Sequence, residues 1–414
     1  MTKVLFFTTI DPSPRNNGKS VVLSGIFDYL QERHGKYFNV AVVGEFLGSD
    51  NIVETIERPS RLVTISNILN YTLLRRKKSI QECFFYSRKI RDRIQALIAE
   101  HKPDMVIFDT VRLAQYVNDL QFSGARKIVY LDDLFSLRYM RMAASDLKSI
   151  GVFGNFEKNI PSSLRFAVDK FDPLKKFILK YEADIIEKSE IRATADCDIS
   201  LLISSSEVDY FKKRHGEMRL AAIPPFLPAT EIVARNWDEK PNFIFLGSMN
   251  LPHNVAGLKV FLTSVFPRVL VHNSVATLTI IGGGVTDELK QCGQPFGQAV
   301  KFLGRVEELS PLLSNACALI APLAFGSGVK LKIIDSLACS LPIISTDIGV
   351  EGIDFIHGVH GELANTWEDF SDSVLKLCDP VKNKYYSKNC KKLFDDIYAK
   401  DSIFDRYDDI FNQY

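Results

Sequence analysis

A glycine-bearing loop is the segment of this sequence best suited to hold an anionic ligand. It follows the short apolar run Ala318 to Ile320 and carries Gly326 and Gly328, which let a backbone approach a bound group closely. A helix is predicted to begin near Val329, so its free N–H groups and the positive end of its dipole face the loop. The pattern therefore predicts a site for a diphosphate.

Charged residues follow at a spacing that adds to this chemistry. Lys330 and Lys332 supply cationic donors, and Asp335 lies about one and a half turns into the predicted helix. A carboxylate at that position can accept hydrogen bonds from the vicinal hydroxyl groups of a ribose. The alternative is that both lysines are solvated helix residues.

Short apolar runs alternate with amphipathic stretches such as Val21 to Glu32 and Phe85 to Ile98, a pattern typical of βαβ units around a parallel sheet. The strands predicted in the first half are Val4 to Thr9, Val40 to Val43, Met105 to Phe108, Ile128 to Leu131 and Ile199 to Ile203. Those in the second half are Asn242 to Leu246, Ala276 to Ile281, Val300 to Phe302, Ala318 to Ile320 and Pro342 to Ser345. The predicted fold class is α/β, with two doubly wound parallel sheets in tandem.

The proline-rich stretch Ile223 to Pro228 marks the expected boundary, because neither a helix nor a central strand accommodates it. We expect an N-terminal domain over residues 1–225, a C-terminal domain over residues 229–395, and a helix over residues 396–414 that packs back on the N-terminal domain. Residues 135–180 show no strand pattern and are predicted to form a helical insertion. Ligands bind at the carboxyl ends of such sheets, so the two domains are expected to face each other across a cleft.

The composition limits the classes of protein that this chain fits. Its 414 residues predict about two to three domains. The net charge is +1, so affinity for nucleic acid or membrane has to come from a local patch. The seven scattered cysteines form no CxxC and are expected to be reduced. There is no apolar run of about eighteen residues, so no membrane-spanning helix is expected, and the apolar N-terminus is predicted to be a buried strand instead of a signal peptide.

The segment Ala321 to Gly352 resembles the donor-binding domain of GT-B glycosyltransferases, in particular the retaining group called family 4. Its ordered pattern is a proline, a glycine loop, basic-Leu-Lys, an aliphatic pair, an acid, small-Leu-Ala and Pro-aliphatic-aliphatic-Ser-Thr. Further matching stretches are Phe245 to Met249, Pro252 to Asn254, Ile280 to Gly284 and Val300 to Val306. The resemblance covers residues 242–380 well and the first domain in outline. It implies two Rossmann-like domains, the first for an acceptor and the second for a nucleotide-sugar donor.

The resemblance also implies which residues serve the donor. Lys330 and Asp335 would be catalytic, together with Asp109 of the first domain. The family commonly has two acids eight positions apart, whereas here Ser327 occupies the first of those positions. The basic pair that many members carry after the first strand of this domain is absent. The implied donor-binding residues are Gly247, Ser248, Met249, Gly282, Arg305, Phe325, Gly326, Ser327, Gly328, Val329, Lys330, Lys332 and Asp335.

Candidates for the acceptor side follow strands of the first domain, and one of them, Gly18, stands where similar enzymes have a glycine-rich loop. The alternative for each acid is a helix N-cap or a structural ion pair. The sequence Gly18-Lys19-Ser20 is no P-loop, because Ser13 stands where that motif requires glycine. The candidates are Gly18, Asp109, Arg112, Asp132, Asp133 and Arg138.

The resemblance implies transfer of a hexose with retention of configuration, by a front-face mechanism in which the leaving diphosphate takes the acceptor proton. No cofactor and no metal is expected. The donor is expected to be a UDP-, GDP- or dTDP-sugar, and the acceptor a glycan or lipid-linked glycan of a cell-surface polysaccharide. The alternatives are a nucleotide-sugar epimerase of the same architecture and a nucleotide-binding scaffold with decayed catalysis, which Ser327 favours.

Residues 71–93 hold eight basic residues against Glu82 and Asp92, a balance of eight minus two, or +6, around Phe84-Phe85-Tyr86. We expect this segment to form a basic aromatic helix that contacts anionic lipid, so that a cytoplasmic protein lies peripherally on the inner face of the cell membrane. A solvated charged helix is the alternative. Nucleic-acid binding is not expected, and His357 to His360 are predicted to form a turn instead of a metal site.

Overall fold

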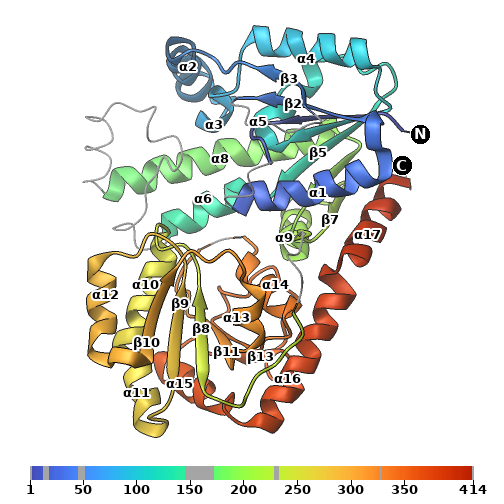
Figure 1. Ribbon diagram of the computed structural model, residues 1–414. Coiled ribbons are helices and arrows are strands. Elements are labelled where there is room, and N and C mark those ends of the chain that lie inside the picture. The colour runs from blue at the N-terminus through green and yellow to red at the C-terminus, as the bar shows by residue number, and fades with distance from the viewer. Residues whose placement is uncertain are drawn as a thin grey trace. The chain divides into compact units, whose positions relative to one another are not determined.

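The computed structural model describes residues 2–12, 18–44, 52–144, 172–227, 233–326 and 328–412. The chain divides into two compact units, which Figure 1 shows coloured along the sequence. Unit 1 comprises Met1–Phe226 and Ile403–Tyr414, and unit 2 comprises Leu227–Ser402. Each unit has one parallel sheet, so the predicted α/β class with two doubly wound sheets is confirmed.

The sheet of unit 1 has seven strands in the order β3-β2-β1-β4-β5-β6-β7. The strands are β1 (Val4–Thr8), β2 (Phe38–Val43), β3 (Ile52–Ile56), β4 (Met105–Asp109), β5 (Arg126–Asp132), β6 (Ile199–Leu202) and β7 (Leu220–Ala222). The order reverses at β1 and β4, which is the switch point where open α/β sheets bind ligands. The strands β3 and β7 were not predicted from the sequence, because β3 alternates in exposure and β7 has only three residues.

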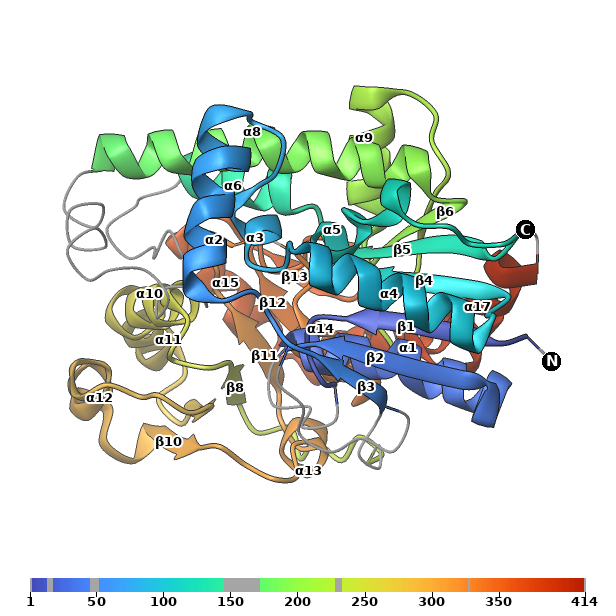
Figure 2. The same ribbon diagram turned by 90° about the horizontal axis from the view of Figure 1, so that it is seen from above.

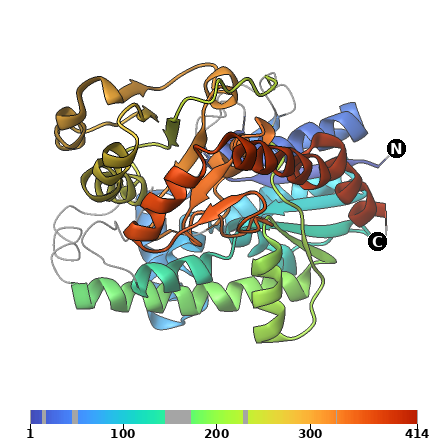
Figure 3. The same cartoon turned by 90° about the horizontal axis from the view of Figure 1, so that it is seen from below.

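Helices cover both faces of this sheet, as the views in Figures 2 and 3 show. Neighbouring residues of a strand point to opposite faces. Phe7 of β1 therefore joins the core beneath α4, whereas Phe6 packs against Phe27 of α1, with ring centroids 4.8 Å apart. The helices of unit 1 are α1 (Gly18–His34), α2 (Arg61–Asn67), the π-helix η2 (Ile68–Leu74), α3 (Ile80–Cys83), α4 (Arg88–His101), α5 (Thr110–Ala114), α6 (Phe135–Ala144), α8 (Asp172–Asp196), α9 (Ser205–His215) and most of α17 (Lys400–Asn412), with short 3-10 turns at Gly35–Tyr37 and Val117–Asp119.

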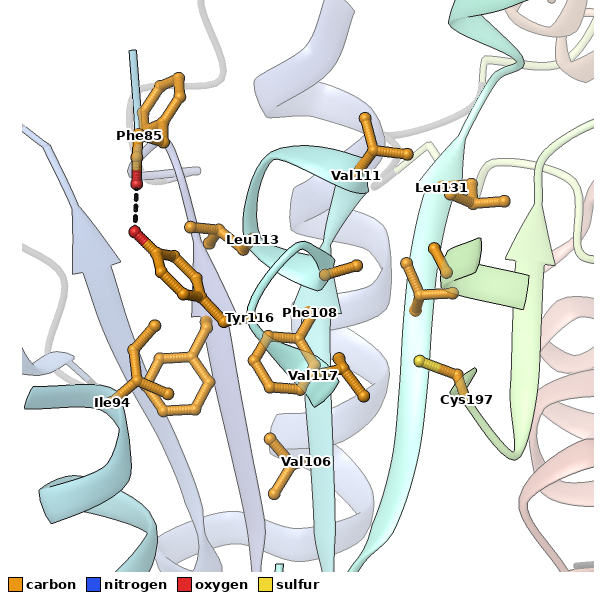
Figure 4. Close-up of a cluster of buried hydrophobic side chains, with 14 of the residues drawn as sticks. Phe85, Ile94, Val106, Phe108, Val111, Leu113, Tyr116, Val117, Leu131 and Cys197 are labelled. Carbon is orange, nitrogen blue, oxygen red and sulfur yellow. Dashed lines mark hydrogen bonds between the residues drawn. The ribbon is translucent and has the colours of Figure 1, made fainter. Parts of the chain in front are cut away.

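The core of unit 1 accommodates a tyrosine because its hydroxyl group has a partner. Tyr116 is fully buried, and its hydroxyl donates a hydrogen bond of 2.6 Å to the carbonyl oxygen of Phe85 (Figure 4). Phe108 stacks on Phe7 with ring centroids 5.5 Å apart. The hydrogen bond between Tyr116 and Phe85 also ties the segment before α4 to the core of unit 1.

The C-terminal helix α17 is tied to α1 within unit 1. The ring of Tyr29 stacks on Tyr407, with centroids 4.7 Å apart, and its hydroxyl donates to Asp408 at 2.8 Å. Arg33 forms a further ion pair with Asp408 at 2.7 Å. The last helix therefore contributes aromatic packing and a charged contact to the fold of unit 1.

The sheet of unit 2 has six strands in the order β10-β9-β8-β11-β12-β13. The strands are β8 (Asn242–Leu246), β9 (Thr277–Ile281), β10 (Val300–Gly304), β11 (Ala318–Ala321), β12 (Ile343–Ser345) and β13 (Gly361–Leu363), the last of which the sequence analysis missed. The helices are α10 (Pro252–Val260), η6 (Phe261–Val265), α11 (Phe266–His272), α12 (Asp287–Gly293), η7 (Gln294–Ala299), α13 (Ser310–Ser314), α14 (Leu331–Ala338), α15 (Trp367–Lys376), α16 (Pro380–Leu393) and η8 (Phe394–Tyr398). The switch point of this sheet lies between β8 and β11.

The continuous stretch Pro252–His272 is long and apolar enough to cross a membrane by length and composition alone. Its apolar residues Leu258, Phe261, Leu262 and Val265 are fully buried against the sheet of unit 2. The core of unit 2 thus accounts for these four apolar residues, while others in the stretch, such as Val271 at 82%, are exposed.

Candidate functional site

The glycine-bearing loop after β11 has the backbone geometry that the sequence predicts. Gly326 has a φ of +139° and Gly328 a φ of +71°, conformations that residues with a side chain rarely adopt. The loop is anchored at its start, where Thr346 donates a hydrogen bond of 2.6 Å to the carbonyl oxygen of Leu323. It ends at α14, which begins at Leu331 and turns its first N–H groups toward the loop.

The two lysines of the loop are held by the protein. Lys330 is buried, and its Nζ donates to the carbonyl oxygen of Gly328 at 2.6 Å. Lys332 donates to Oδ1 of Asn254 at 2.8 Å and lies 5.0 Å from the ring centroid of Phe245. Burial, together with the charge of Lys330, lowers the pKa of Lys332 to about 7. These contacts contradict the alternative of two freely solvated lysines.

Asp335 lies one turn into α14 and has no side-chain partner among the described residues. Burial raises the pKa of its carboxyl group to about 7. A carboxylate in such surroundings gains from any hydroxyl group that donates to it. The arrangement is suited to a ligand with hydroxyl groups. Ser327, which was also expected to bind the donor, lies outside the described residues.

His253 is a residue of this site that the sequence analysis did not select. It belongs to the first turn of α10, and its ring lies 6.2 Å from that of Phe325. A Cβ atom at Gly326 would lie 3.5 Å from Cε of Lys330 and 4.0 Å from Cγ of His253. Burial and the charges of Lys332 and Lys330 lower the pKa of His253 to about 4, so the imidazole is neutral at pH 7. The matching stretch Pro252 to Asn254 was the sequence signal that could have identified it.

The loops after β8 and β9 pack so tightly that glycine is required at their contact. Gly282 has a φ of +144°, and a Cβ atom there would lie 1.9 Å from the carbonyl oxygen of Gly247. Asn254 donates to the carbonyl oxygen of Ser248 at 2.9 Å while it accepts from Lys332. One asparagine thus joins the loop after β8 to the lysine of α14.

Two other expected donor residues lie beside these loops in different surroundings. The side chain of Met249 is 3% exposed and belongs to the core of unit 2, so its expected contact with a donor stays a prediction. Only its backbone lines the loop, where its N–H donates to the carbonyl oxygen of Gly283 at 2.8 Å. Arg305 is exposed and lies against Gly283, and Val329 is partly buried before α14.

Unit 1 gathers charged groups at the carboxyl ends of β4 and β5. Nζ of Lys19 lies 2.7 Å from Oδ1 of Asp109 and 3.1 Å from Oδ2 of Asp132. Oδ2 of Asp109 accepts from Oγ1 of Thr9 at 3.0 Å. Burial alone would lower the pKa of Lys19, but the charges of Asp109 and Asp132 outweigh it and raise that pKa. The two carboxylates thus share one cation.

Lys19 is the second residue that the sequence analysis missed. Its signal was Gly18-Lys19-Ser20, which follows the first predicted strand and opens a helix, and from which only Gly18 was selected as a candidate. Gly18 is the first residue of α1, and the residues before it, 13–17, lie outside the described part. The backbone is strained at the same edge, since Thr110 has a φ of +60° and Asp132 a φ of +71°. Such strain is typical of functional sites.

The other candidates of unit 1 are engaged in separate contacts. Asp133 is buried and forms an ion pair with Arg138. Arg112 donates to Oε1 of Gln81 at 2.6 Å, and its guanidinium lies 5.0 Å from the ring centroid of Phe135. The structure therefore joins Asp109 and Asp132 through Lys19, and joins Asp133 to Arg138, while Arg112 is held by α3 and α6.

Residues 71–93 do not form the basic aromatic helix that we expected. They span the end of η2, a turn, α3 and the start of α4. Phe85 belongs to the core, and Phe84 and Tyr86 pack against it, because the backbone around them is tied to Tyr116. Three basic residues of α4 are ion-paired: Lys89 with Glu57, Arg91 with Asp92 and Arg93 with Glu54.

Comparisons with known proteins identify glycosyltransferases with this arrangement of two parallel-sheet units. Residues 240–379, most of unit 2, match the family model for glycosyl transferases group 1. HepE of Anabaena, solved in complex with UDP, is 10% identical, covers 100% of both chains and has a TM-score of 0.65. WaaG, a glycosyltransferase involved in lipopolysaccharide biosynthesis, is 14% identical, covers 98% of this chain and 99% of WaaG and has a TM-score of 0.57. The likeness to these two structures shows that the chain has the GT-B fold, and residues 240–379 in unit 2 carry a glycosyl transferases group 1 domain.

One curated relative is similar in sequence. It is an uncharacterized 44.6 kDa protein in the cps region of Klebsiella pneumoniae, 29% identical over 231 residues. The match covers 53% of this chain and 55% of the relative, so the chain spans about half the length of the curated relative that it matches.

Proposed function

We propose that this protein transfers a hexose from a nucleotide sugar to a glycan or lipid-linked acceptor with retention of configuration, in the biosynthesis of a cell-surface polysaccharide. The observation that carries the proposal is the loop after β11. Two held lysines, two glycines with positive φ and a carboxylate without a side-chain partner among the described residues adjoin the start of one helix there. The cps region of the relative and the involvement of WaaG in lipopolysaccharide biosynthesis support the pathway. UDP is the first nucleotide to test, because HepE was solved with it.

The chemistry assigned to the loop is stabilisation of the leaving diphosphate. Lys330 and the N–H groups of α14 would neutralise the charge that develops as the bond to the sugar breaks. Lys332 would add a second positive charge, since a nearby diphosphate favours its protonated form. Asp335 would accept hydrogen bonds from the ribose hydroxyl groups and so orient the nucleotide.

The proposed transfer needs no cofactor, no metal and no protein nucleophile. In the proposed front-face reaction the bond from the anomeric carbon to the diphosphate breaks, and the acceptor oxygen bonds to the same face. The proton of the acceptor hydroxyl passes to the departing diphosphate. For unit 1, we propose that the edge formed by Asp109 and Asp132 receives the acceptor on the cytoplasmic side of the membrane.

Nucleotide binding is the test of the donor site. Thermal unfolding is measured with UDP, GDP, dTDP, CMP and NAD in EDTA, for the wild type and for Lys330→Ala, Asp335→Ala and the control Lys290→Ala, which changes an exposed lysine of α12. Stabilisation by one nucleoside diphosphate, lost in the first two variants and kept in the control, supports the site and identifies the base. No stabilisation by any nucleotide contradicts it. Binding without release of nucleotide from its sugar, with any acceptor, would favour the scaffold with decayed catalysis.

A further inference from the structure

The helical segment formed by α2 and η2 exposes most of its apolar residues, whereas its buried residues, Thr64, Asn67 and Thr72, are polar. Leu62 is 80% exposed, Leu74 77%, and Ile65, Leu69 and Leu73 are each half exposed or more. These five residues, at spacings of three, four, four and one, form a surface that we name the leucine ridge. The segment lies at the periphery of unit 1, next to α3, in both Figures 1 and 2.

The inner side of the same segment is polar and has its partners. Asn67 is buried and donates to the carbonyl oxygens of Tyr86, at 2.7 Å, and of Cys83, at 3.3 Å. Thr72 is fully buried and donates to the carbonyl oxygen of Lys78 at 2.9 Å. These hydrogen bonds fix the orientation of the helix, so the leucine ridge cannot turn inward without leaving buried carbonyl groups unpaired. An apolar face held outward in this way is typical of a docking surface.

Cations flank the leucine ridge at both ends. Arg61 precedes it, and Arg75, Arg76 and Lys77 follow it, all of them exposed. From residue 61 to residue 81 the sequence contains no acidic residue. Within the described part of the chain none of these four cations forms an ion pair, in contrast to Lys89, Arg91 and Arg93 of α4. The stretch thus combines exposed apolar side chains with positive charge that no carboxylate neutralises.

We infer that the leucine ridge and its four flanking cations bind the surface of a bilayer that contains anionic lipid. Apolar side chains of a surface helix enter the boundary of the acyl chains, and cations beside them contact the headgroups. A second copy of the chain fits less well, since a symmetric contact along this helix would bring two sets of unpaired cations together. The inference moves the expected membrane contact from residues 71–93 to residues 61–77. It does not depend on the proposed reaction.

Vesicle co-sedimentation tests this inference with the full chain. The vesicles are phosphatidylcholine alone or phosphatidylcholine mixed with phosphatidylglycerol. The test variant is L69S/L73S, and its control is V271S/V381S, which removes two valines of unit 2 that are even more exposed than these leucines. A charge variant, R75Q/R76Q, is compared with K89Q/R91Q on α4. Thermal unfolding of each variant verifies that it folds.

We expect the wild type to bind the anionic vesicles more tightly than the neutral ones. L69S/L73S should weaken binding to the anionic vesicles by roughly tenfold for each leucine. R75Q/R76Q should weaken it by about fivefold for each cation, and both controls should bind like the wild type. Failure of the folded wild type to bind, or equal binding by L69S/L73S, overturns the inference. So does a dimer in light scattering that L69S/L73S converts to a monomer, because the ridge would then be a contact between copies of the chain. Intact nucleotide binding in L69S/L73S distinguishes this outcome from failure of the proposed function.

Discussion

Binding of UDP to unit 2 is expected to be strongest near pH 7 and to weaken on both sides of it. The alkaline side follows from Lys332, whose pKa is lowered to about 7 by burial and by Lys330. A bound diphosphate raises this pKa, so above pH 7 each binding event must take up a proton. The dissociation constant should therefore rise by about tenfold for each pH unit above 7.

The weakening of binding below pH 7 follows from Asp335, which releases a proton on binding where Lys332 takes one up. Burial raises the pKa of this carboxyl group to about 7 in the free protein. Ribose hydroxyl groups that donate to the carboxylate lower that pKa, so below pH 7 binding must release a proton. Affinity is then lost as the pH falls, again by about tenfold for each unit until the pKa of the complex is reached.

Isothermal titration calorimetry in two buffers of different ionisation enthalpy measures both the affinity and the number of protons exchanged. At pH 8 we expect uptake of about one proton, and at pH 6 release of about one. Lys332→Arg keeps the positive charge at every pH of interest, so it should remove the alkaline decline. Asp335→Asn cannot ionise, so it should remove the part of the acid decline that belongs to the protein.

The control is Lys376→Arg, which changes a lysine of α15 and should leave the pH profile unchanged. An alkaline decline that persists in Lys332→Arg would refute the role given to Lys332. Absence of proton exchange at pH 8 in the wild type would also refute this role, because the bound diphosphate would then leave the pKa of Lys332 unchanged.

Two further predictions concern the stability of each unit. Gly282→Ala should lower the free energy of unfolding by roughly 3 kcal/mol, because its Cβ would lie 1.9 Å from the carbonyl oxygen of Gly247 at a φ of +144°. Gly297→Ala, at a φ of +53° with no atom within 4 Å, should cost only about 1 kcal/mol, and equal losses in urea unfolding would show that the contact is not tight. Lys19→Met should cost roughly 3–5 kcal/mol at pH 7, because it leaves Asp109 and Asp132 together without their cation. Burial raises the pKa of Asp132, so the loss should be smaller at pH 4 than at pH 7, and an equal loss at both pH values would contradict the shared ion pair.

Much of the fold was predictable because buried parallel strands appear in the sequence as short, continuous apolar runs. Runs such as Val4 to Thr9 and Asn242 to Leu246 are apolar on both sides of the strand, and the structure has β1 and β8 there. The glycine-bearing loop after β11 was predictable because its glycines, its lysines and the start of α14 lie within a few residues of each other in the sequence. The strands that escaped prediction, β3, β7 and β13, are short or partly exposed, so their residues carry no continuous apolar run.

The sequence by itself determined the α/β class, the succession of two such domains and the residue types of the loop from Gly326 to Asp335. Each of these depends only on residues that are close together in the sequence. The tertiary structure decided which distant residues meet. It placed Lys19 between Asp109 and Asp132, and His253 beside Phe325, since such contacts depend on the order of strands in a sheet. It also decided that Asn67 faces inward and Leu69 outward, because buried backbone carbonyl groups must be paired and an amide can pair them, whereas a leucine cannot.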